Sequence, residues 1–326
     1  MSATKLKSFY VLDILRKYSD SEHRLTAENI CSLLKSEYSV SAERKGIYRD
    51  IDALGEYGVD IKKTSTGFFV DTRVFRVAEI RLLVSAIQAA SFITPDKAAM
   101  LTEKLSSQLS VHQAEQIIGK SHIGVVKYES NEVYKTIETV NNAISGHRQL
   151  SFYYYKKNLS KQDVPQHNGT RYLVSPYAMI WHMDNYYLVC NSAGHEGLTH
   201  FRIDRIKGAY PEQIPWRHFS EVSEYKLRFD ASDYAKKCIN MFGGEITTVT
   251  LRCKNARITE ILDKFGNSTP LRRDGNEHFI TIVDVAMSTG FLSWVAQFFD
   301  GIEIISPASA RNALKEYLKQ TLTLYE

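Results

Sequence analysis

The spacing of apolar residues changes along the chain, and these changes limit the folds that it can adopt. Up to about residue 145 the apolar residues recur every three to four positions, which is the period of an amphipathic helix. Between 148 and 210 they alternate in short runs typical of strands, and from 246 onward strand and helix patterns follow one another. A chain of 326 residues has room for two or three domains. We therefore expect an α+β protein of several domains.

The first 70 residues predict three helices and a β-hairpin. Thr26 and Ser41 stand where they would cap the second and third helices. In the third helix Ile47, Ile51 and Leu54 share one face, which predicts the buried side. The stretch VDIKK, the turn TSTG and the stretch FFV then predict a hairpin. This layout is that of a winged helix-turn-helix, over residues 1–72.

The polar face of that third helix carries the candidate DNA contacts, because a helix-turn-helix presents it to the major groove. The alternative is a helical protein-interaction domain, and a net charge of only +1 over residues 1–70 does not separate the two, since Asp50 and Asp52 offset the arginines. The predicted DNA-binding residues, on the helix and then on the wing, are Ser41, Arg44, Lys45, Tyr48, Arg49, Lys62 and Lys63.

Residues 73–130 predict a helical connector. The stretch RVAEIRLLVSAIQAASF is apolar around most of its circumference, and Thr94-Pro95-Asp96 restarts a helix. A helix that is apolar on two sides needs a partner on each, which favours packing within the domain and against a second subunit. We therefore expect a homodimer.

Residues 131–212 predict a helix followed by a compact β region, a small barrel of the SH3 or Sm kind. Residues 146–210 hold 8 basic and 4 acidic residues, with five of the ten His and eight of the nineteen Tyr. Basic residues interleaved with aromatic ones suit an anionic ligand that can stack, although a solvated Tyr-rich barrel has the same composition. In FRIDRI, Arg202 and Asp204 share a side, and Ile206 predicts a bend near Asp204-Arg205.

Residues 213–326 predict a unit of β-α-β-β-α-β type, followed by a closing helix from Pro307. Asp274-Gly275 predicts a hairpin turn, and Gly266 and Gly301 stand where helices end. The pattern indicates a ferredoxin-like domain, a fold that by itself assigns no chemistry.

The ordered motifs resemble the bacterial WYL-domain transcriptional regulators, which combine a winged helix-turn-helix, a WYL domain and a C-terminal WCX extension. The matching stretches are SAERKGIYRDIDAL with GFFV, RYLVSPYAMIWHMDNYYLVC with HFRIDRIKG, and FLSWVAQFFDGIEIISPASARNAL. The tripeptide that names the family is Tyr186-Tyr187-Leu188 here, so Tyr replaces Trp and the indole N–H donor is absent.

The resemblance implies a regulator whose WYL domain binds a nucleic acid or nucleotide-like effector and changes its affinity for a duplex DNA operator. Arginines suit phosphate and tyrosines suit bases; a buried core role for Tyr187 and a structural Arg202–Asp204 pair are the alternatives. Carried over by motif or by nearness in the sequence, the candidate effector contacts are Ser175, Tyr177, His182, Tyr187, His200, Arg202 and Arg205.

Other chemistries are weakly supported. AEQIIGKS (114–121) fits a relaxed phosphate-loop pattern, but bulky isoleucines occupy the loop. Cys190, His195 and His200 lack a fourth zinc ligand, and no catalytic motif has a supporting context. We expect a cytoplasmic protein that is not an enzyme and that has no cofactor, no metal and no membrane partner. The alternative function is an RNA- or single-strand-binding accessory protein that acts through the WYL barrel.

Overall fold

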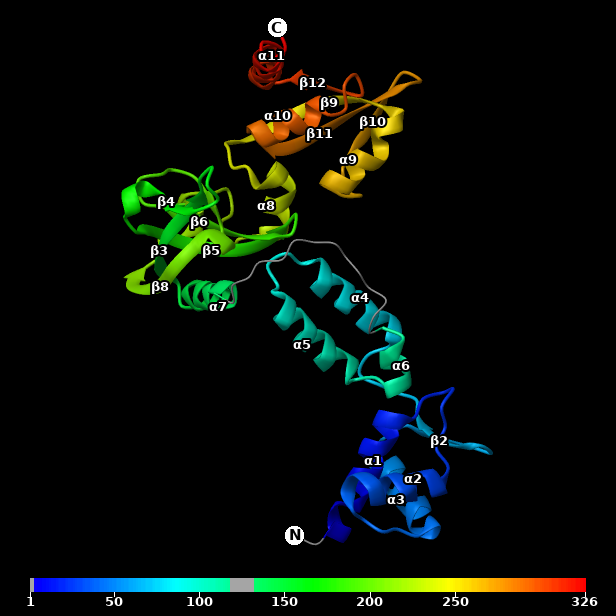
Figure 1. The fold of residues 1–326 in the computed structure, drawn as a ribbon. Coiled ribbons are helices and arrows are strands. Elements are labelled where there is room, and N and C mark those ends of the chain that lie inside the picture. Colours follow the sequence, from blue (N-terminus) through cyan, green and yellow to red (C-terminus); the bar gives the residue numbers. More distant parts are fainter. Residues whose placement is uncertain (1–2, 118–131) are drawn as a thin grey trace. The chain divides into compact units, whose positions relative to one another are not determined.

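The computed structural model describes residues 3–117 and 132–326 (Figure 1). The chain divides into two compact units, residues 1–129 and residues 130–326. The first unit is helical apart from one hairpin, and the second is a mixture of helices and antiparallel sheets. The α+β class predicted from the spacing of apolar residues is therefore confirmed.

The first unit begins with the predicted three helices and hairpin. They are α1 (Ala3–Tyr18), α2 (Ala27–Tyr38), α3 (Arg44–Glu56), β1 (Ile61–Thr64) and β2 (Gly67–Val70). Ile47, Ile51 and Leu54 of α3 are buried against the other two helices, as their spacing predicts. The isolated bridge between Leu25 and Phe68 ties the segment before α2 to the hairpin.

The two predicted helix caps have different outcomes. The Thr26 side chain accepts a hydrogen bond from the backbone of Asn29, and the Asn29 side chain accepts one in return, so the capping of α2 is confirmed. The prediction for Ser41 is wrong, because α3 begins at Arg44 and its N-cap is Glu43, whose side chain makes no capping bond. The buried face of α3, rather than a capping bond, accounts for the helix.

Three more helices complete the described part of the first unit: α4 (Val77–Ala89), α5 (Pro95–Ser106) and α6 (Val111–Glu115). A buried carboxylate joins the start of α6 to the end of α1, since Asp20 Oδ2 accepts a hydrogen bond of 2.5 Å from Ser110 Oγ, the N-cap of α6. Arg73 adds a bond of 2.6 Å to the Ser19 carbonyl. Ile80 and Val84 of α4 are buried, whereas Leu82 on the same helix is 72% exposed.

The second unit starts with a helix and a curled antiparallel sheet. Its elements are α7 (Glu132–Ser145), β3 (Arg148–Lys157), β4 (Asp163–Pro165), β5 (Tyr172–His182), β6 (Asn185–Ser192), β7 (Thr199–Arg202) and β8 (Ile206–Pro215). The strand order is β4-β3-β5-β6-β7, and β8 pairs with β3. Phe152, Tyr154, Leu188 and Phe201 fill the inside of the curl.

The rest of the second unit follows the predicted order of strands and helices. After α8 (Ala231–Lys237) come β9 (Ile246–Lys254), α9 (Ile258–Phe265), β10 (Leu271–Asp274), β11 (His278–Ala286), α10 (Thr289–Ala296), β12 (Ile302–Ser306) and α11 (Ala308–Leu322). The antiparallel sheet has the order β10-β11-β9-β12. Its core contains Val249, Leu251 and Phe291, so this sheet has a hydrophobic core separate from that of the curled sheet.

None of the helices in residues 3–117 and 132–326 combines the length and the apolar character needed to span a lipid bilayer. The four cysteines are free thiols. Cys190, Cys238 and Cys253 are buried, and Cys31 is partly buried.

Candidate nucleic-acid interfaces

One face of α3 is polar and open to solvent. Arg44, Lys45, Tyr48 and Arg49 are exposed, while Ile47 between them is buried. This alternation follows from the helical period, which places residues three and four apart on one side. The exposed face predicted for this helix is therefore confirmed, and its contact with DNA stays a prediction.

Asp50 does not share that face, contrary to the charge balance drawn from the sequence. Its side chain points toward α1, where Oδ1 accepts a hydrogen bond of 2.9 Å from Ser8 Oγ and Oδ2 lies 2.9 Å from Lys7 Nζ. The carboxylate is thus neutralised inside the helical core. It does not offset the positive charge that α3 shows to solvent.

Three cations of the predicted interface, Arg44, Lys62 and Lys63, are paired with carboxylates. Arg44 lies 2.9 Å from a Glu28 carboxylate oxygen. Lys62 lies 3.0 Å from Asp60, which raises the pKa of the Lys62 ammonium, and Lys63 pairs with Asp52. Exposed ion pairs contribute little free energy, so Arg44, Lys62 and Lys63 could each exchange a carboxylate for a phosphate at little cost in free energy.

Lys45 and Arg49 form no ion pair within the described residues. Tyr48 stands between them in the sequence and is 46% exposed, and its ring is nearly perpendicular to the Phe68 ring, with the two centroids 5.6 Å apart. Two cations without a counter-ion and a tyrosine held against β2 therefore form the centre of the exposed face. Cations and an amphipathic ring are suited to phosphates and base edges.

Ser175 and Tyr177, two of the predicted effector contacts, are buried on β5. Ser175 Oγ accepts a hydrogen bond of 2.9 Å from the Arg217 backbone N–H, and the Tyr177 hydroxyl donates one of 2.7 Å to the Arg217 carbonyl. Burial raises the pKa of the Tyr177 hydroxyl. Both side chains hold the segment after β8 against the sheet, so neither is open to a ligand in this structure.

Tyr187 and His200 lie on a face of the curled sheet that α8 covers. Tyr187 packs in the same cluster as Tyr234 and Cys238 of that segment. His200 Nε2 lies 3.0 Å from the Tyr234 hydroxyl, and burial lowers the pKa of His200 to about 4. The His200 imidazole is therefore neutral near pH 7 and packs between the sheet and α8. A neutral ring in this position does not attract an anion.

His182, at the end of β5, is also partly buried. Burial and the nearby charge of Lys264 lower the pKa of its imidazole. Its Nε2 atom has no hydrogen-bond partner within the described residues. The histidine is thus expected to be neutral, and it offers no fixed positive charge to an effector.

Arg202 and Arg205 stand at a corner between β7 and β8. Arg202 binds Asp204 through two bonds, Nε to Oδ1 at 3.0 Å and a terminal nitrogen to Oδ2 at 2.9 Å. The predicted bend is confirmed as a short 3-10 turn over Ile203–Arg205. Tyr187 and Arg202 are register partners in the sheet, so the structure brings these two together. It does not bring Ser175 and Tyr177 to the same corner.

The sequence prediction named none of the cations on the outer side of β3. The Arg171 guanidinium lies 4.8 Å from the centre of the Tyr153 ring, and Lys207 Nζ lies 4.8 Å from the centre of the Tyr155 ring. The signal was present in the basic excess of residues 146–210 and in the alternation of FYYYK. The motif comparison did not identify Arg171 and Lys207, because the tyrosine rings that they contact are distant from them in the sequence.

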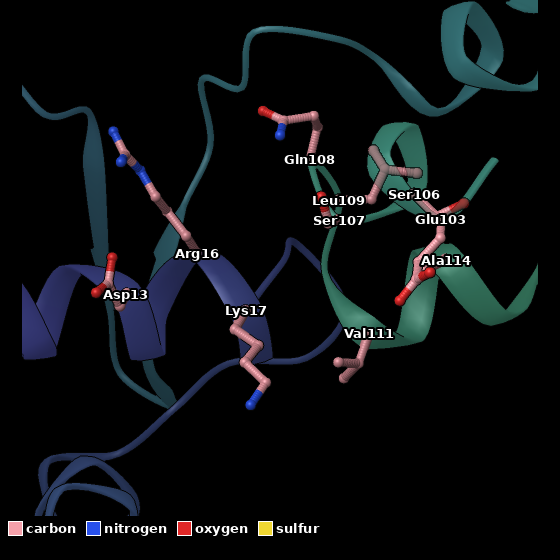
Figure 2. Close-up of a pocket in the computed structure, with 10 residues that line it drawn as sticks. All are labelled: Asp13, Arg16, Lys17, Glu103, Ser106, Ser107, Gln108, Leu109, Val111 and Ala114. Atoms are coloured by element: carbon pink, nitrogen blue, oxygen red, sulfur yellow. The ribbon is translucent and has the colours of Figure 1, made fainter. Parts of the chain in front are cut away.

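A small cavity of about 190 Å³ is lined by Lys207 and Gly208, among others, and two larger cavities lie elsewhere. One of about 510 Å³ lies between α1 and the ends of α5 and α6, where Arg16 and Lys17 extend to different sides (Figure 2). Another of about 410 Å³ is lined by Tyr225, Tyr234 and Asp284, among others. No predicted effector contact lines either cavity. The phosphate-loop-like stretch 114–121 lies partly outside the described residues.

Residues 135–211 match the family model of the WYL domain, which confirms the resemblance for this part of the chain. No match is found among curated proteins. Among solved structures the chain is similar to proteasome accessory factor B/C (PafBC) of Arthrobacter aurescens, at 15% identity and a TM-score of 0.28, over 98% of this chain and 49% of that chain.

The chain is also similar to a CRISPR Cas-related protein, at 15% identity and a TM-score of 0.37, over 99% of this chain and 86% of that one. The chain spans about half the length of PafBC. At these identities and TM-scores, neither superposition supports an argument about function.

Proposed function

We propose that this chain, which carries a WYL domain at residues 135–211, is a ligand-responsive regulator of transcription that binds duplex DNA. In this proposal α1 to α3 and the β1–β2 hairpin act as a winged helix-turn-helix, and α3 enters the major groove. The curled sheet acts as the WYL barrel and senses a nucleic acid or nucleotide-like effector. The proposal includes no enzymatic step.

The observation that carries the proposal is the exposed centre of α3. Lys45 and Arg49 have no counter-ion within the described residues: of the two carboxylates that would oppose them, Asp50 is turned inward to Lys7 and Ser8, and Asp52 pairs with Lys63. A helix of this kind attracts an anion along one side only. Duplex DNA is the anion whose major groove admits a helix and presents base edges to it.

Dimerisation is part of the proposal, and α4 is the element that supports it. Leu82 is 72% and Leu83 39% exposed on α4, whose opposite side is already buried. Two copies related by a two-fold axis would place two α3 helices on half-sites separated by about 34 Å or a multiple of it. The operator is then expected to be an inverted repeat.

A mobility-shift assay tests the proposal. The purified chain is mixed with duplex DNA from upstream of its own gene, and random duplex and single-stranded oligonucleotides serve as competitors. A regulator prefers one duplex sequence over random duplex.

The second candidate is an RNA- or single-strand-binding accessory protein, which the basic and aromatic residues of the WYL domain favour. Binding without preference for a duplex sequence, erased by single strands, would support that candidate instead.

A further inference from the structure

The largest of the three cavities, about 510 Å³, lies inside the first unit. Its volume is within the range of pockets that bind a small molecule. Figure 2 shows α1 as one wall, with Asp13, Arg16 and Lys17, and the helices α5 and α6 as the other. None of the predicted DNA or effector contacts in the described residues lines it. The proposed function therefore leaves this cavity without a ligand.

Ser106, at the end of α5, contributes a buried hydroxyl to the wall of the cavity. The residue is only 3% exposed, and its Oγ atom has no hydrogen-bond partner within the described residues. Burying a hydroxyl without a hydrogen bond is unfavourable, because the group loses its contact with water and gains nothing in return. An unpartnered hydroxyl in a cavity wall therefore indicates a ligand with a polar atom.

The charged side chains that line the cavity are of both signs. Arg16 on the α1 wall and Glu103 on the α5 wall form no ion pair within the described residues, and neither does Asp13. Lys17 is bound to Glu37, which does not line the cavity, at 3.2 Å. A ligand that is only an anion would meet the like charge of Glu103, and one that is only a cation would meet that of Arg16. Free charges of both signs favour a zwitterion.

The remaining part of the lining that matters here is apolar. It consists of Leu109, in the turn between α5 and α6, and of Val111 and Ala114 on α6. Leu109 is 3% exposed, and the other two are partly buried. This apolar lining gives a hydrocarbon side chain a surface on which it leaves water.

We propose that the cavity binds a small zwitterion with an apolar side chain, either a free amino acid or a dipeptide. The ammonium group binds Glu103 and Ser106, which are three residues apart on α5 and therefore on one side of that helix. The carboxylate binds Arg16 of α1, and the side chain contacts the apolar lining. This inference goes beyond the proposed function, because it places a ligand in the first unit and depends on no contact with DNA.

Isothermal titration calorimetry of the full chain tests the site with L-leucine and with leucyl-leucine, each at up to about 10 mM. Isocaproate has the carboxylate and side chain of leucine without the ammonium group, and isoamylamine has the ammonium group without the carboxylate. The better zwitterion is expected to bind about fivefold tighter than either analogue, because each analogue lacks one ion pair. Whichever zwitterion binds tighter shows whether a free amino acid or a peptide is the ligand.

Two charge-removing variants assign the two ends of the ligand. Arg16→Gln should weaken binding of the better zwitterion about fivefold and should not weaken binding of isoamylamine. Glu103→Gln should weaken binding of the zwitterion about fivefold and should not weaken binding of isocaproate. The matched controls are Arg81→Gln and Glu56→Gln, which are exposed and do not line the cavity, and they should leave every affinity unchanged.

Ser106→Ala separates the loss of a ligand contact from the loss of the fold. It should weaken binding of the zwitterion about fivefold, because one hydrogen bond to the ammonium group is removed. It should not lower the free energy of unfolding in urea, because the hydroxyl has no partner to lose within the described residues. Ser36→Ala is the control, since Ser36 is exposed on α2 and should affect binding of neither zwitterion.

Three results would overturn the inference: no binding of either zwitterion at about 10 mM, equal affinity for the zwitterions and the one-charge analogues, or unchanged zwitterion binding in the Arg16, Glu103 and Ser106 variants. The proposed function stands in all three cases. It fails separately, if the wild type shows no preference for a duplex sequence.

Discussion

At the scale of single residues, Asp50 determines how much positive charge α3 presents to a ligand. Because the Asp50 carboxylate is held by Lys7 and Ser8, it does not neutralise Arg49, the exposed residue before it in α3. Arg49→Ala should therefore weaken operator binding by about 1–3 kcal/mol if it contacts a base. Anisotropy titration of the duplex measures this effect.

The matched control is Arg81→Ala, which removes an exposed arginine from α4 and should leave the affinity within about twofold. An equal loss in both variants would mean that only the total charge matters. An unchanged affinity in Arg49→Ala would remove Arg49 from the interface.

His200 links the stability of the second unit to pH. Burial lowers its pKa to about 4, from 6.5 in the unfolded chain, so below pH 6.5 the unfolded chain takes up a proton that the folded protein does not. Stability should be full above pH 6.5 and fall by at most about 3 kcal/mol as the pH drops to 4. Urea unfolding between pH 7 and about pH 4 measures the loss.

His200→Gln should flatten that pH dependence, because Gln can keep a hydrogen bond to the Tyr234 hydroxyl without titrating in this range. His195→Gln, at an exposed position, serves as the control and should retain the wild-type slope. A wild-type slope in His200→Gln would show that another group takes up the proton.

Some single-residue contacts could be predicted because both partners are close in the sequence. The Arg202–Asp204 pair follows from alternation in FRIDRI, and the structure contains it. The burial of Ser175 and Tyr177 could not be predicted, because the group that covers them is Arg217, about 40 residues away in the sequence. The family motif identified Ser175 and Tyr177 as effector contacts. Their hydrogen bonds to the Arg217 backbone show instead that they fix the segment after β8 to the sheet.

At the scale of elements, α6 depends on one side chain for two contacts. Ser110 Oγ accepts a hydrogen bond from the Gln113 backbone at 3.1 Å and donates one to buried Asp20 after α1. Ser110→Ala should destabilise the contact between α6 and α1 by about 1–3 kcal/mol, since it removes a cap and leaves a buried carboxylate short of a donor. Hydrogen exchange at the amides of α1 and α6 measures it.

Ser107→Ala is the control, because Ser107 is exposed and its hydroxyl donates only to the Lys104 carbonyl. Its exchange rates should match those of the wild type. Equal protection in Ser110→Ala would show that the bond to Asp20 adds nothing to the contact.

The exposed apolar side of α4 is the proposed dimer interface, and a substitution there tests the oligomeric state. Leu82→Asp should convert a dimer to a monomer at micromolar concentration, because it places a charge on the proposed interface. Leu318→Asp, at a 48% exposed position on α11, should leave the mass unchanged. Light scattering distinguishes the two, and a monomeric wild type would contradict the dimer itself.

Element positions were largely predictable, because helix and strand periods are local properties of the sequence. The caps show the limit: Thr26 acts as predicted, while Ser41 lies outside α3, which begins at Arg44. Both residues have a capping side chain, and only the packing of α3 decides where its first turn starts. Likewise, the bond that joins α1 to α6 spans 90 residues and leaves no local pattern.

At the scale of the whole molecule, the proposed function assigns DNA binding to the first unit and effector sensing to the second. Arg202→Ala should therefore spare duplex binding and abolish the change in operator affinity on adding the effector, since it breaks the corner with Asp204 without touching α3. Anisotropy titration of the operator with and without single-stranded DNA measures both. A retained response would exclude Arg202 from the sensing site.

The most direct test of the central claim is a mobility shift of the purified chain on duplex DNA from upstream of its own gene, with Arg49→Ala beside the wild type. We expect retention that random duplex does not compete away, that single strands modulate, and that Arg49→Ala weakens. Retention that is indifferent to duplex sequence and erased by single strands would contradict it.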